Sequence, residues 1–499
     1  MGAYSKILSR PWFLLGLLLK GCLCTLLLHS AGATAEIKQS GGWFETLKDN
    51  ASDLELHKFL YAMPKGGDLH HHLTGAIHPE WFHEIAMAQA SRGYSYFVKT
   101  KINNCQVGGN EFGPNAYLLL FRTIQESTFK ALSDCVKGEY KPLGELSEEE
   151  LDAWKKSQHL DKPYEGRSEF FEAHWSRIGE MVTNPYLVAE AIYYNMRSFG
   201  AEGMLYLEAQ VPVTNYVKAD GSAFPVDEVM AIFRERINQV DAKATGVTIR
   251  FQWAILRFLP NAEDDLRAGF DFVSKTPEYV GLNMVGREDN DKGYPLRFLD
   301  TLRELRHSYS NVRLAIHAGE VDEPNRHVRE TLLLGADRIG HGVNLITDPD
   351  TMLLMRHGPY MVEINLISNL LLEYVSDYSQ HPFPEYLRTG IPVALSTDDR
   401  GMWDSTLTDE FFVAVREFDL SWREIRELST NSIAYSFVEP KVKDDLLNTL
   451  NKRLDAFEKR FRPPVTAKQG FSRIKVTPEY RGFLCRRYNV CNPEAATQR

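Results

Sequence analysis

Residues 68–75 read DLHHHLTG, and the three consecutive histidines are the first residues in the chain whose type and spacing could do chemistry. In a β-strand, His70 and His72 point to one face and His71 points to the other, because side chains alternate along a strand. Two imidazoles on one face suit a single zinc ion, which binds histidine nitrogen at ~2.0–2.1 Å. The pair alone does not establish a metal site, because two histidines on one face can also be purely structural.

Two later residues would complete a ligand set for such an ion. His317 and Asp398 each lie at the end of a short apolar run. With His70 and His72 they would supply three nitrogens and one oxygen, a set that suits zinc and leaves room for one water. A zinc ion with this open position lowers the pKa of the water toward ~7 and makes hydroxide available at neutral pH. We therefore predict a hydrolytic site that holds one zinc ion.

Three further polar residues have side chains that could take part in the reaction. Glu320 follows His317 by three positions, so it could act as an acid that donates a proton to the substrate. His341, between two glycines, could hold or deprotonate the attacking water. Asp399 follows Asp398 directly and can turn into a pocket at a strand end. Each residue could instead have a purely structural role. Glu320 could be an acid at a helix N-terminus, His341 a buried structural histidine and Asp399 a helix cap.

These residues lie in a chain that alternates between short apolar, β-rich runs and helical patterns. Helical patterns such as 264–275 and 326–336 fill the gaps between the runs. Eight alternations of strand and helix predict a (β/α)8 TIM barrel, with a doubly wound open sheet as the alternative. The eight runs are GDLHHHL (67–73), MLYLEAQV (204–211), TIRFQWAIL (248–256), VGLNMVG (280–286), RLAIHAGE (313–320), RIGHG (338–342), YMVEINLIS (360–368) and PVALSTDD (392–399).

Most of the predicted strands end in a polar residue. Barrel enzymes build their sites at the C-terminal ends of the strands. One polar strand end is usually a turn or a helix cap, but six that are rich in histidine and carboxylate predict a shared site. These six residues are His72, Glu208, His317, His341, Ser368 and Asp398.

The first and second predicted strands are too far apart for one crossover helix. Residues 98–165 are therefore expected to form an insertion within a barrel that spans 63–462. The insertion could be a disulfide-linked subdomain or lid over the barrel mouth, or a surface segment with no role in the site. Residues 463–499 begin with a Pro-Pro break and are expected to be a C-terminal extension on the surface.

Residues 1–35 have a basic start, a hydrophobic middle and small residues at the expected cleavage site, the layout of a secretory signal peptide. Cleavage near Ala35 would leave a short segment, 36–62, before the barrel and would give a secreted or periplasmic protein. A retained membrane anchor is the alternative. Nothing after Ala35 is apolar and long enough to span a bilayer, and the formal net charge of −10 argues against nucleic acid as the main partner.

Four of the six cysteines lie beyond the predicted signal peptide and form two local pairs. In an oxidising compartment, Cys105 with Cys135 and Cys485 with Cys491 could be disulfides, and four free thiols are the alternative. The chain has no zinc-ribbon spacing such as CxxC, so the cysteines do not match a zinc site.

Six segments of the chain resemble the adenosine deaminase family of metal-dependent amidohydrolases. They follow the order and spacing of the family over about residues 60–440, and the set is far more specific than any one segment. The exported start and MPKG (63–66) look like the secreted branch that includes the adenosine deaminase-related growth factors. The segments are DLHHHLTGAIHPE (68–80), VGREDN (285–290), AIHAGE (315–320), RIGHGVNL (338–345), EINLISNLLL (363–372) and STDD (396–399).

The resemblance implies a zinc site and a set of groups that hold a purine. Glu320 would protonate N1, His341 would orient the attacking hydroxide at C6, and Asp399 would hydrogen-bond N7. Gly286 would offer its backbone to N3. The zinc ligands would be His70, His72, His317 and Asp398, of which His72 would also touch the substrate.

Two positions depart from the family pattern. Thr74 lies where the family commonly has an aspartate that contacts the ribose, and Asn283 begins a stretch that is commonly Asp-Leu-x-Gly. Both changes affect the sugar side or the pocket wall more than the metal. About 28 residues separate Ala35 from Pro64, too few for the N-terminal dimerisation region of the growth factors. The oligomeric state is therefore not predicted.

The implied reaction is the hydrolytic deamination of adenosine and 2′-deoxyadenosine to inosine and 2′-deoxyinosine, with release of ammonia. Thr74 motivates an alternative substrate, either adenine or an N6- or 5′-modified adenosine. A catalytically inactive secreted signalling protein is a second alternative, motivated by the insertion at 98–165. The intact ligand set with Glu320 and His341 argues against it. The HxE…PCxxC signature of cytidine-type deaminases is absent.

Overall fold

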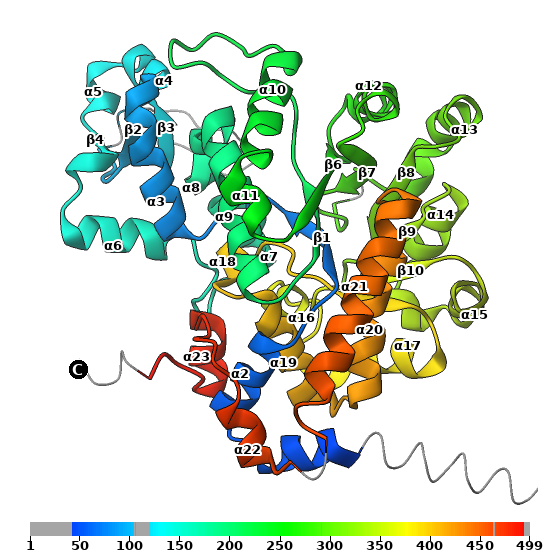
Figure 1. The fold of residues 1–499 in the computed structure, drawn as a ribbon. Coiled ribbons are helices and arrows are strands. Elements are labelled where there is room, and N and C mark those ends of the chain that lie inside the picture. The colour runs from blue at the N-terminus through cyan, green and yellow to red at the C-terminus, as the bar shows by residue number, and fades with distance from the viewer. Residues whose placement is uncertain (1–41, 104, 106–118, 291, 463–464, 494–499) are drawn as a thin grey trace, which may run out of the picture.

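The computed structural model describes residues 42–103, 105, 119–290, 292–462 and 465–493. Eight parallel strands form its centre, hydrogen-bonded in the order β1-β5-β6-β7-β8-β9-β10-β11 (Figure 1). A parallel bridge between His71 and Asp398 links the first strand to the chain just after the last, so the barrel is nearly closed. The strands are β1 (Gly67–His72), β5 (Tyr206–Gln210), β6 (Thr248–Leu256), β7 (Tyr279–Val285), β8 (Arg313–Ala318), β9 (Arg338–His341), β10 (Met361–Ile364) and β11 (Val393–Leu395).

The nearly closed sheet confirms the predicted (β/α)8 barrel, and each of the eight apolar runs contains one strand. Two predicted strand ends are wrong. Ser368 lies in helix α16 (Leu366–Leu371), because β10 ends earlier than the apolar run does. Glu208 lies in the middle of β5 and points into the barrel interior, so the polar residue at the end of that strand is Gln210.

Helices cover the outside of the barrel between successive strands (Figure 1). The expected helical patterns at 264–275 and 326–336 correspond to α12 and α14. Apolar residues alternate with polar ones on the strands, so that leucine, isoleucine and phenylalanine meet the helices while polar groups fill the interior. The main helices are α9 (Pro185–Ala201), α10 (Val226–Ile237), α12 (Ala262–Lys275), α13 (Leu299–Ser308), α14 (His327–Leu333), α15 (Pro349–His357), α17 (Phe383–Thr389), α19 (Leu407–Phe418), α20 (Trp422–Ala434) and α21 (Pro440–Glu458).

A network of buried charged and amide side chains fills the barrel interior below the mouth. Arg338 on β9 lies between two carboxylates, since its Nε is 2.6 Å from Glu363 Oε1 and its Nη2 is 2.6 Å from Glu208 Oε2. Gln252 on β6 donates to the same Glu208 oxygen at 2.7 Å. These side chains are at most 1% exposed. Burying a charge is costly unless it is paired, so this network constrains which strands can be neighbours.

A small antiparallel sheet stands beside the barrel in the region where an insertion is expected (Figure 1). It consists of β2 (Tyr96–Lys99), β3 (Thr123–Gln125) and β4 (Tyr140–Pro142), and a disulfide ties Cys105 to Cys135. Helix α6 (Glu148–Lys156) follows, with Ser147 and Glu150 forming a capping box at its start. None of the described residues in 98–165 lines the main cavity of the barrel.

The two ends of the described chain pack together on the barrel. Helix α2 (Asp53–Ala62) leads into β1, and α22 (Ala467–Ser472) and α23 (Gly482–Tyr488) lie in the C-terminal extension. Arg481 forms ion pairs with Glu80 and Glu479, and Cys485 is bonded to Cys491. The predicted signal peptide lies outside the described residues. In the described part of the chain, no helix has both the length and the apolar character needed to cross a membrane.

Replacing Arg338 by methionine should cost about 3–5 kcal/mol in the free energy of unfolding, because Glu208 and Glu363 would stay buried without a cation. Chemical denaturation followed by circular dichroism measures this loss. Arg313→Met is the matched control, since Arg313 is 59% exposed and pairs with Asp337 at the surface. The free energy of unfolding of Arg313→Met should fall by no more than about 1 kcal/mol. Equal losses in the two variants would contradict a stabilising role for the interior network.

Candidate active site

Three histidines and one aspartate converge at the C-terminal mouth of the barrel. His72 Nε2 lies 3.1 Å from His317 Nε2 and 3.2 Å from Asp398 Oδ1. His70 Nε2 lies 3.5 Å from the same aspartate oxygen. The four residues come from β1, from β8 and from the turn after β11, where Asp398 has a positive φ of 55°. The structure therefore brings together the four residues that the sequence suggested as zinc ligands.

The far side of two of these rings is held by hydrogen-bond acceptors. His70 Nδ1 lies 2.7 Å from Glu363 Oε2, and His317 Nδ1 lies 2.9 Å from Asn283 Oδ1. An acceptor at Nδ1 places the ring hydrogen there and leaves the Nε2 lone pair directed into the cluster, the arrangement that metal-binding histidines need. His70 Nε2 has no hydrogen-bond partner within the described chain.

The charges around the cluster favour a cation at its centre. Burial lowers the pKa of His70, but the nearby carboxylates of Asp398 and Glu363 outweigh it and raise that pKa to about 10. Burial lowers the pKa of His72 to about 4 and that of His317 well below its ordinary value, so both rings are neutral near pH 7. Neutral imidazoles with a carboxylate form a donor set that fits a zinc ion.

His341 lies in the same cluster. One ring nitrogen of His341 lies within 4.8 Å of the ligand atoms of His70, His317 and Asp398. Its position at the end of β9 carries a positive φ of 61°, which is uncommon outside glycine. His71 points the other way, where its ring meets Phe199 and Thr397. Distance alone therefore leaves two candidates, His72 and His341, for the third histidine ligand.

Two buried acids, Glu320 and Asp399, lie beside the cluster. Burial and the negative charges of Asp398 and Glu288 raise the pKa of Glu320 well above its ordinary value. Burial and the adjacent Asp398 raise the pKa of Asp399 in the same way. The raised pKa values favour the protonated forms of both carboxyl groups, which can donate a hydrogen bond or a proton. Asp399 Oδ1 has no hydrogen-bond partner in the part of the chain that the structure describes.

Glycines allow the close packing around these groups. A side chain at Gly75, the last residue of DLHHHLTG, would collide with the Asp399 carboxylate. A Cβ at Gly340 would lie 2.8 Å from the His70 ring. Both glycines therefore keep space for side chains of the site, a role that their identity in the sequence did not reveal.

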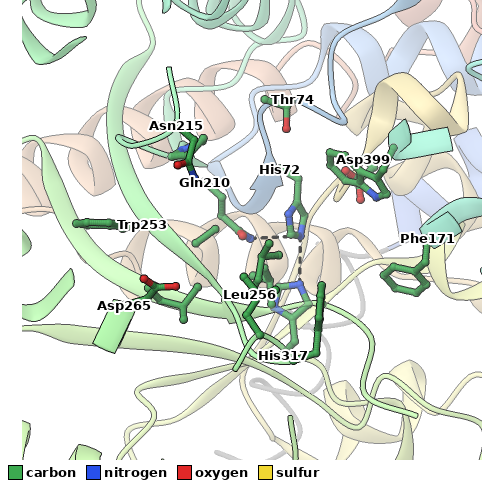
Figure 2. Close-up of a pocket in the computed structure, with 18 of the residues that line it drawn as sticks. His72, Thr74, Phe171, Gln210, Asn215, Trp253, Leu256, Asp265, His317 and Asp399 are labelled. Atoms are coloured by element: carbon green, nitrogen blue, oxygen red, sulfur yellow. Dashed lines mark hydrogen bonds between the residues drawn. The ribbon is translucent and has the colours of Figure 1, made fainter. Parts of the chain in front are cut away.

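A cavity of about 730 Å³ opens from this cluster. Figure 2 shows His72 and His317 next to each other, with Asp399 on one side of them and Trp253 and Asp265 on the other. The predicted residues Thr74, Gly286 and Glu320 also line it, while His70 and His341 lie behind the lining. We did not predict Gln210, whose Nε2 lies 3.4 Å from His72 Nε2. Nor did we predict the aromatic part of the wall, which consists of Phe170, Phe171, Trp175, Trp253 and Phe258.

Comparison with known proteins agrees with this geometry. The family model for adenosine deaminase matches residues 144–453. An adenosine deaminase of Aedes albopictus is 27% identical over 267 residues, covering 50% of this chain and 49% of that protein. An N6-methyl-AMP deaminase-L of Xenopus laevis is 28% identical over 254 residues, covering 50% of this chain and 71% of that protein. The match to the mosquito enzyme thus spans about half of its length.

A solved structure shares the fold. The crystal structure of an adenine deaminase from Arthrobacter aurescens superposes with a TM-score of 0.58 at 17% sequence identity, covering 79% of this chain and 99% of that one. The matched family region contains seven of the eight barrel strands, with His317, His341 and Asp398, whereas His70 and His72 on β1 lie outside it. This protein therefore belongs to the adenosine deaminase family.

Proposed function

We propose that the protein is a zinc-dependent adenosine deaminase that converts adenosine and 2′-deoxyadenosine to inosine and 2′-deoxyinosine with release of ammonia. The observation that carries the proposal is the convergence of His72, His317 and Asp398 in the wall of a cavity of about 730 Å³ that Glu320 also lines. A family of hydrolases that act on C–N bonds supplies the reaction class.

In this proposal, His70, His72, His317 and Asp398 hold one zinc ion. When bound, zinc supplies a Lewis acid that makes water nucleophilic at neutral pH. Ser368 donates to Asp398 Oδ2 at 2.6 Å and so orients that carboxylate. Glu363 and Asn283 orient the His70 and His317 rings from behind.

Glu320 and Asp399 match two of the three acceptor nitrogens of the adenine ring, N1 and N7. Glu320 donates its proton to N1, which makes C6 electrophilic and lets the ring accept the electrons of the addition. Asp399 donates a hydrogen bond to N7 through its protonated carboxyl group. Gly286, with a positive φ of 99°, offers its backbone N–H to N3. The raised pKa values of Glu320 and Asp399 support these roles, because an ionised carboxylate could donate neither proton.

The charge of the cavity supports a nucleoside over a nucleotide as substrate. The described lining includes no lysine or arginine, whereas the half-buried Asp265 adds a carboxylate. Asp265 pairs with the Asn261 amide at 3.1 Å and forms no ion pair with a described residue. A phosphate group would meet repulsion there instead of the cations that usually bind it. This separates the proposal from the N6-methyl-AMP activity named for the Xenopus relative.

We also propose that the enzyme is exported, with residues 1–35 removed as a signal peptide. The disulfides Cys105–Cys135 and Cys485–Cys491 support this proposal, since disulfides persist in oxidising compartments. N-terminal sequencing of the protein recovered from outside the cytoplasm tests it. A retained start at Met1 would contradict it.

Glu320→Gln should lower the turnover of adenosine by at least about 10²-fold, because an amide cannot donate a proton to the ring. The measurement is the absorbance change as adenosine becomes inosine, with metal content determined on the same sample. A zinc chelator should abolish the activity of the unaltered protein. Full activity in Glu320→Gln protein that contains metal would refute the assigned role of this acid.

His70→Ala should lose both zinc and activity, whereas His71→Ala should retain one zinc per chain. His71 is the matched control because it is equally buried and adjacent, but its ring contacts Phe199 and Thr397 on the outer side of the strand. Metal analysis after dialysis measures the difference. Loss of zinc from both variants would mean that strand alternation does not select the ligands.

Adenosine should have a kcat/KM at least about tenfold above that of AMP, since a repulsive contact of ~1.4 kcal/mol already gives that factor. Asp265→Lys should raise kcat/KM for AMP and so reduce the difference between the two substrates. High salt should weaken this increase. Adenine and 5′-deoxyadenosine complete the panel, because Thr74 occupies a position near the sugar. A clear preference for adenine or for AMP would overturn adenosine as the substrate.

A further inference from the structure

A chain of three buried hydrogen bonds stands behind His341. The backbone N–H of Phe383 donates to His381 Nδ1 at 3.1 Å, and His381 Nε2 lies 3.0 Å from Asn369 Oδ1. Asn369 Nδ2 then lies 2.9 Å from His341 Nδ1. The three side chains are at most 3% exposed. They connect the start of α17 through α16 to the end of β9.

The backbone amide fixes the direction of every bond in this chain. A peptide N–H can only donate, so His381 Nδ1 carries no hydrogen and accepts. The hydrogen of His381 must then be on Nε2, which requires an acceptor, so Asn369 presents its oxygen there. The amide nitrogen of Asn369 consequently faces His341 and donates to Nδ1. A ring that accepts at Nδ1 carries its hydrogen on Nε2.

Asn365 is a second amide beside the same nitrogen of His341, at a longer distance of 3.3 Å. Its own nitrogen meets two acceptors, the carbonyls of Ser396 and Ile364, when the amide is turned toward them. That orientation leaves only the Asn365 oxygen near the His341 ring. The shorter bond from Asn369, whose direction the backbone fixes, therefore decides the tautomer.

A hydrogen on His341 Nε2 has two consequences at the mouth of the barrel. That nitrogen cannot coordinate a metal ion, because coordination needs its lone pair. His72, and not His341, is then the third histidine ligand, which settles what distance alone left open. The same nitrogen cannot accept a proton from water either. It can only donate a hydrogen bond into the site, where Glu320 Oε2 lies 3.6 Å away.

We propose that Asn369 and His381 are positioning residues that set the tautomer of His341, so that this ring offers the oxygen nucleophile a hydrogen-bond donor and no acceptor. This role rests on the proposed deaminase function, whereas the tautomer itself does not. His341 neither gains nor loses a proton in this role. The rotation and hydrogen placement of the ring are prepared before substrate arrives, so no binding energy is needed to order them.

Histidine-selective ¹⁵N labelling of the full chain tests the tautomer in the unaltered protein. The spectrum is recorded on chelator-treated protein and again after one equivalent of zinc is added, and His341→Gln identifies the signals of His341. We expect a protonated Nε2 and an unprotonated Nδ1 in both samples. A protonated Nδ1 with a bare Nε2 would overturn the proposal, whatever the activity of the protein.

Asn369→Asp separates a donor from a general base, because the two roles predict opposite effects. A carboxylate behind the ring can only accept, so it draws a hydrogen to Nδ1 and creates the pairing that suits a histidine base. If His341 is a donor, kcat should fall by about 10²-fold with little change in KM and with metal retained. An unchanged or increased kcat would overturn the donor role.

Asn184→Asp is the matched control for adding a buried carboxylate. Asn184 is also fully buried, but it caps α9 and contacts Tyr96, away from the cluster. Its kcat should stay within about twofold, since a cap position accepts aspartate readily.

His381→Leu removes the anchor of the chain, so the Asn369 amide can turn and the His341 signals should show mixed tautomers. An unmixed Nε2–H tautomer in folded His381→Leu protein would refute the positioning role of His381. If both variants fail to fold, the spectrum of the unaltered protein still decides the tautomer. If the unaltered protein does not deaminate adenosine, the proposed function fails while this spectrum is unaffected.

Discussion

The pairing of Arg338 with Glu208 and Glu363 inside the barrel is the interaction on which the site depends. Both carboxylates are buried, and each also accepts a second hydrogen bond, Glu363 from His70 and Glu208 from Gln252. Without the guanidinium, two negative charges would remain in a space from which water is excluded. The orientation of the histidines therefore depends on the pairing of Arg338 with the two carboxylates in the barrel interior.

A continuous path of hydrogen bonds connects the interior network to the mouth of the barrel. From Glu208 it passes through Gln252 to Asn283, whose amide nitrogen donates to Gln252 Oε1 at 3.0 Å, and reaches His317. Glu363 and Asn283 thereby face the Nδ1 atoms of His70 and His317 and turn their Nε2 atoms toward the cluster, while the bonds behind His341 direct a hydrogen to its Nε2. The group behind a buried imidazole thus decides which ring nitrogen carries the hydrogen and what the ring offers to the site.

Much of the fold could be predicted from the sequence because strand periodicity and spacing are local signals. The eight runs and the alternation in DLHHHLTG needed only neighbouring residues, and the structure brings His70, His72, His317 and Asp398 together. Ser368 and Glu208 were misplaced because an apolar run does not show where a strand stops or how deep a residue lies.

The supporting groups could not be predicted, because their partners are far apart in the chain. His70 and Glu363 are separated by 293 residues, and nothing local to either one indicates the contact. The pairing of Asn283 with His317 is also invisible until β7 and β8 are placed side by side. Likewise, His381 looks like an ordinary loop histidine until the start of α17 is folded against α16. The departure at Asn283 was visible, but its role as an acceptor for a cluster histidine was not.

The interior network also bears on how the molecule reaches its native state. Arg338, Glu208, Glu363 and Gln252 come from four strands, and the hydrogen bonds onward to His70, Asn283 and His317 add three more. The network is therefore complete only when almost the whole barrel has assembled. A half-barrel would leave these charged side chains without their partners. It would also lack some of the cluster residues and the groups that orient the histidine rings. Contacts of such long sequence separation form slowly. The barrel should therefore behave as one cooperative unit that does not divide into independently folding halves.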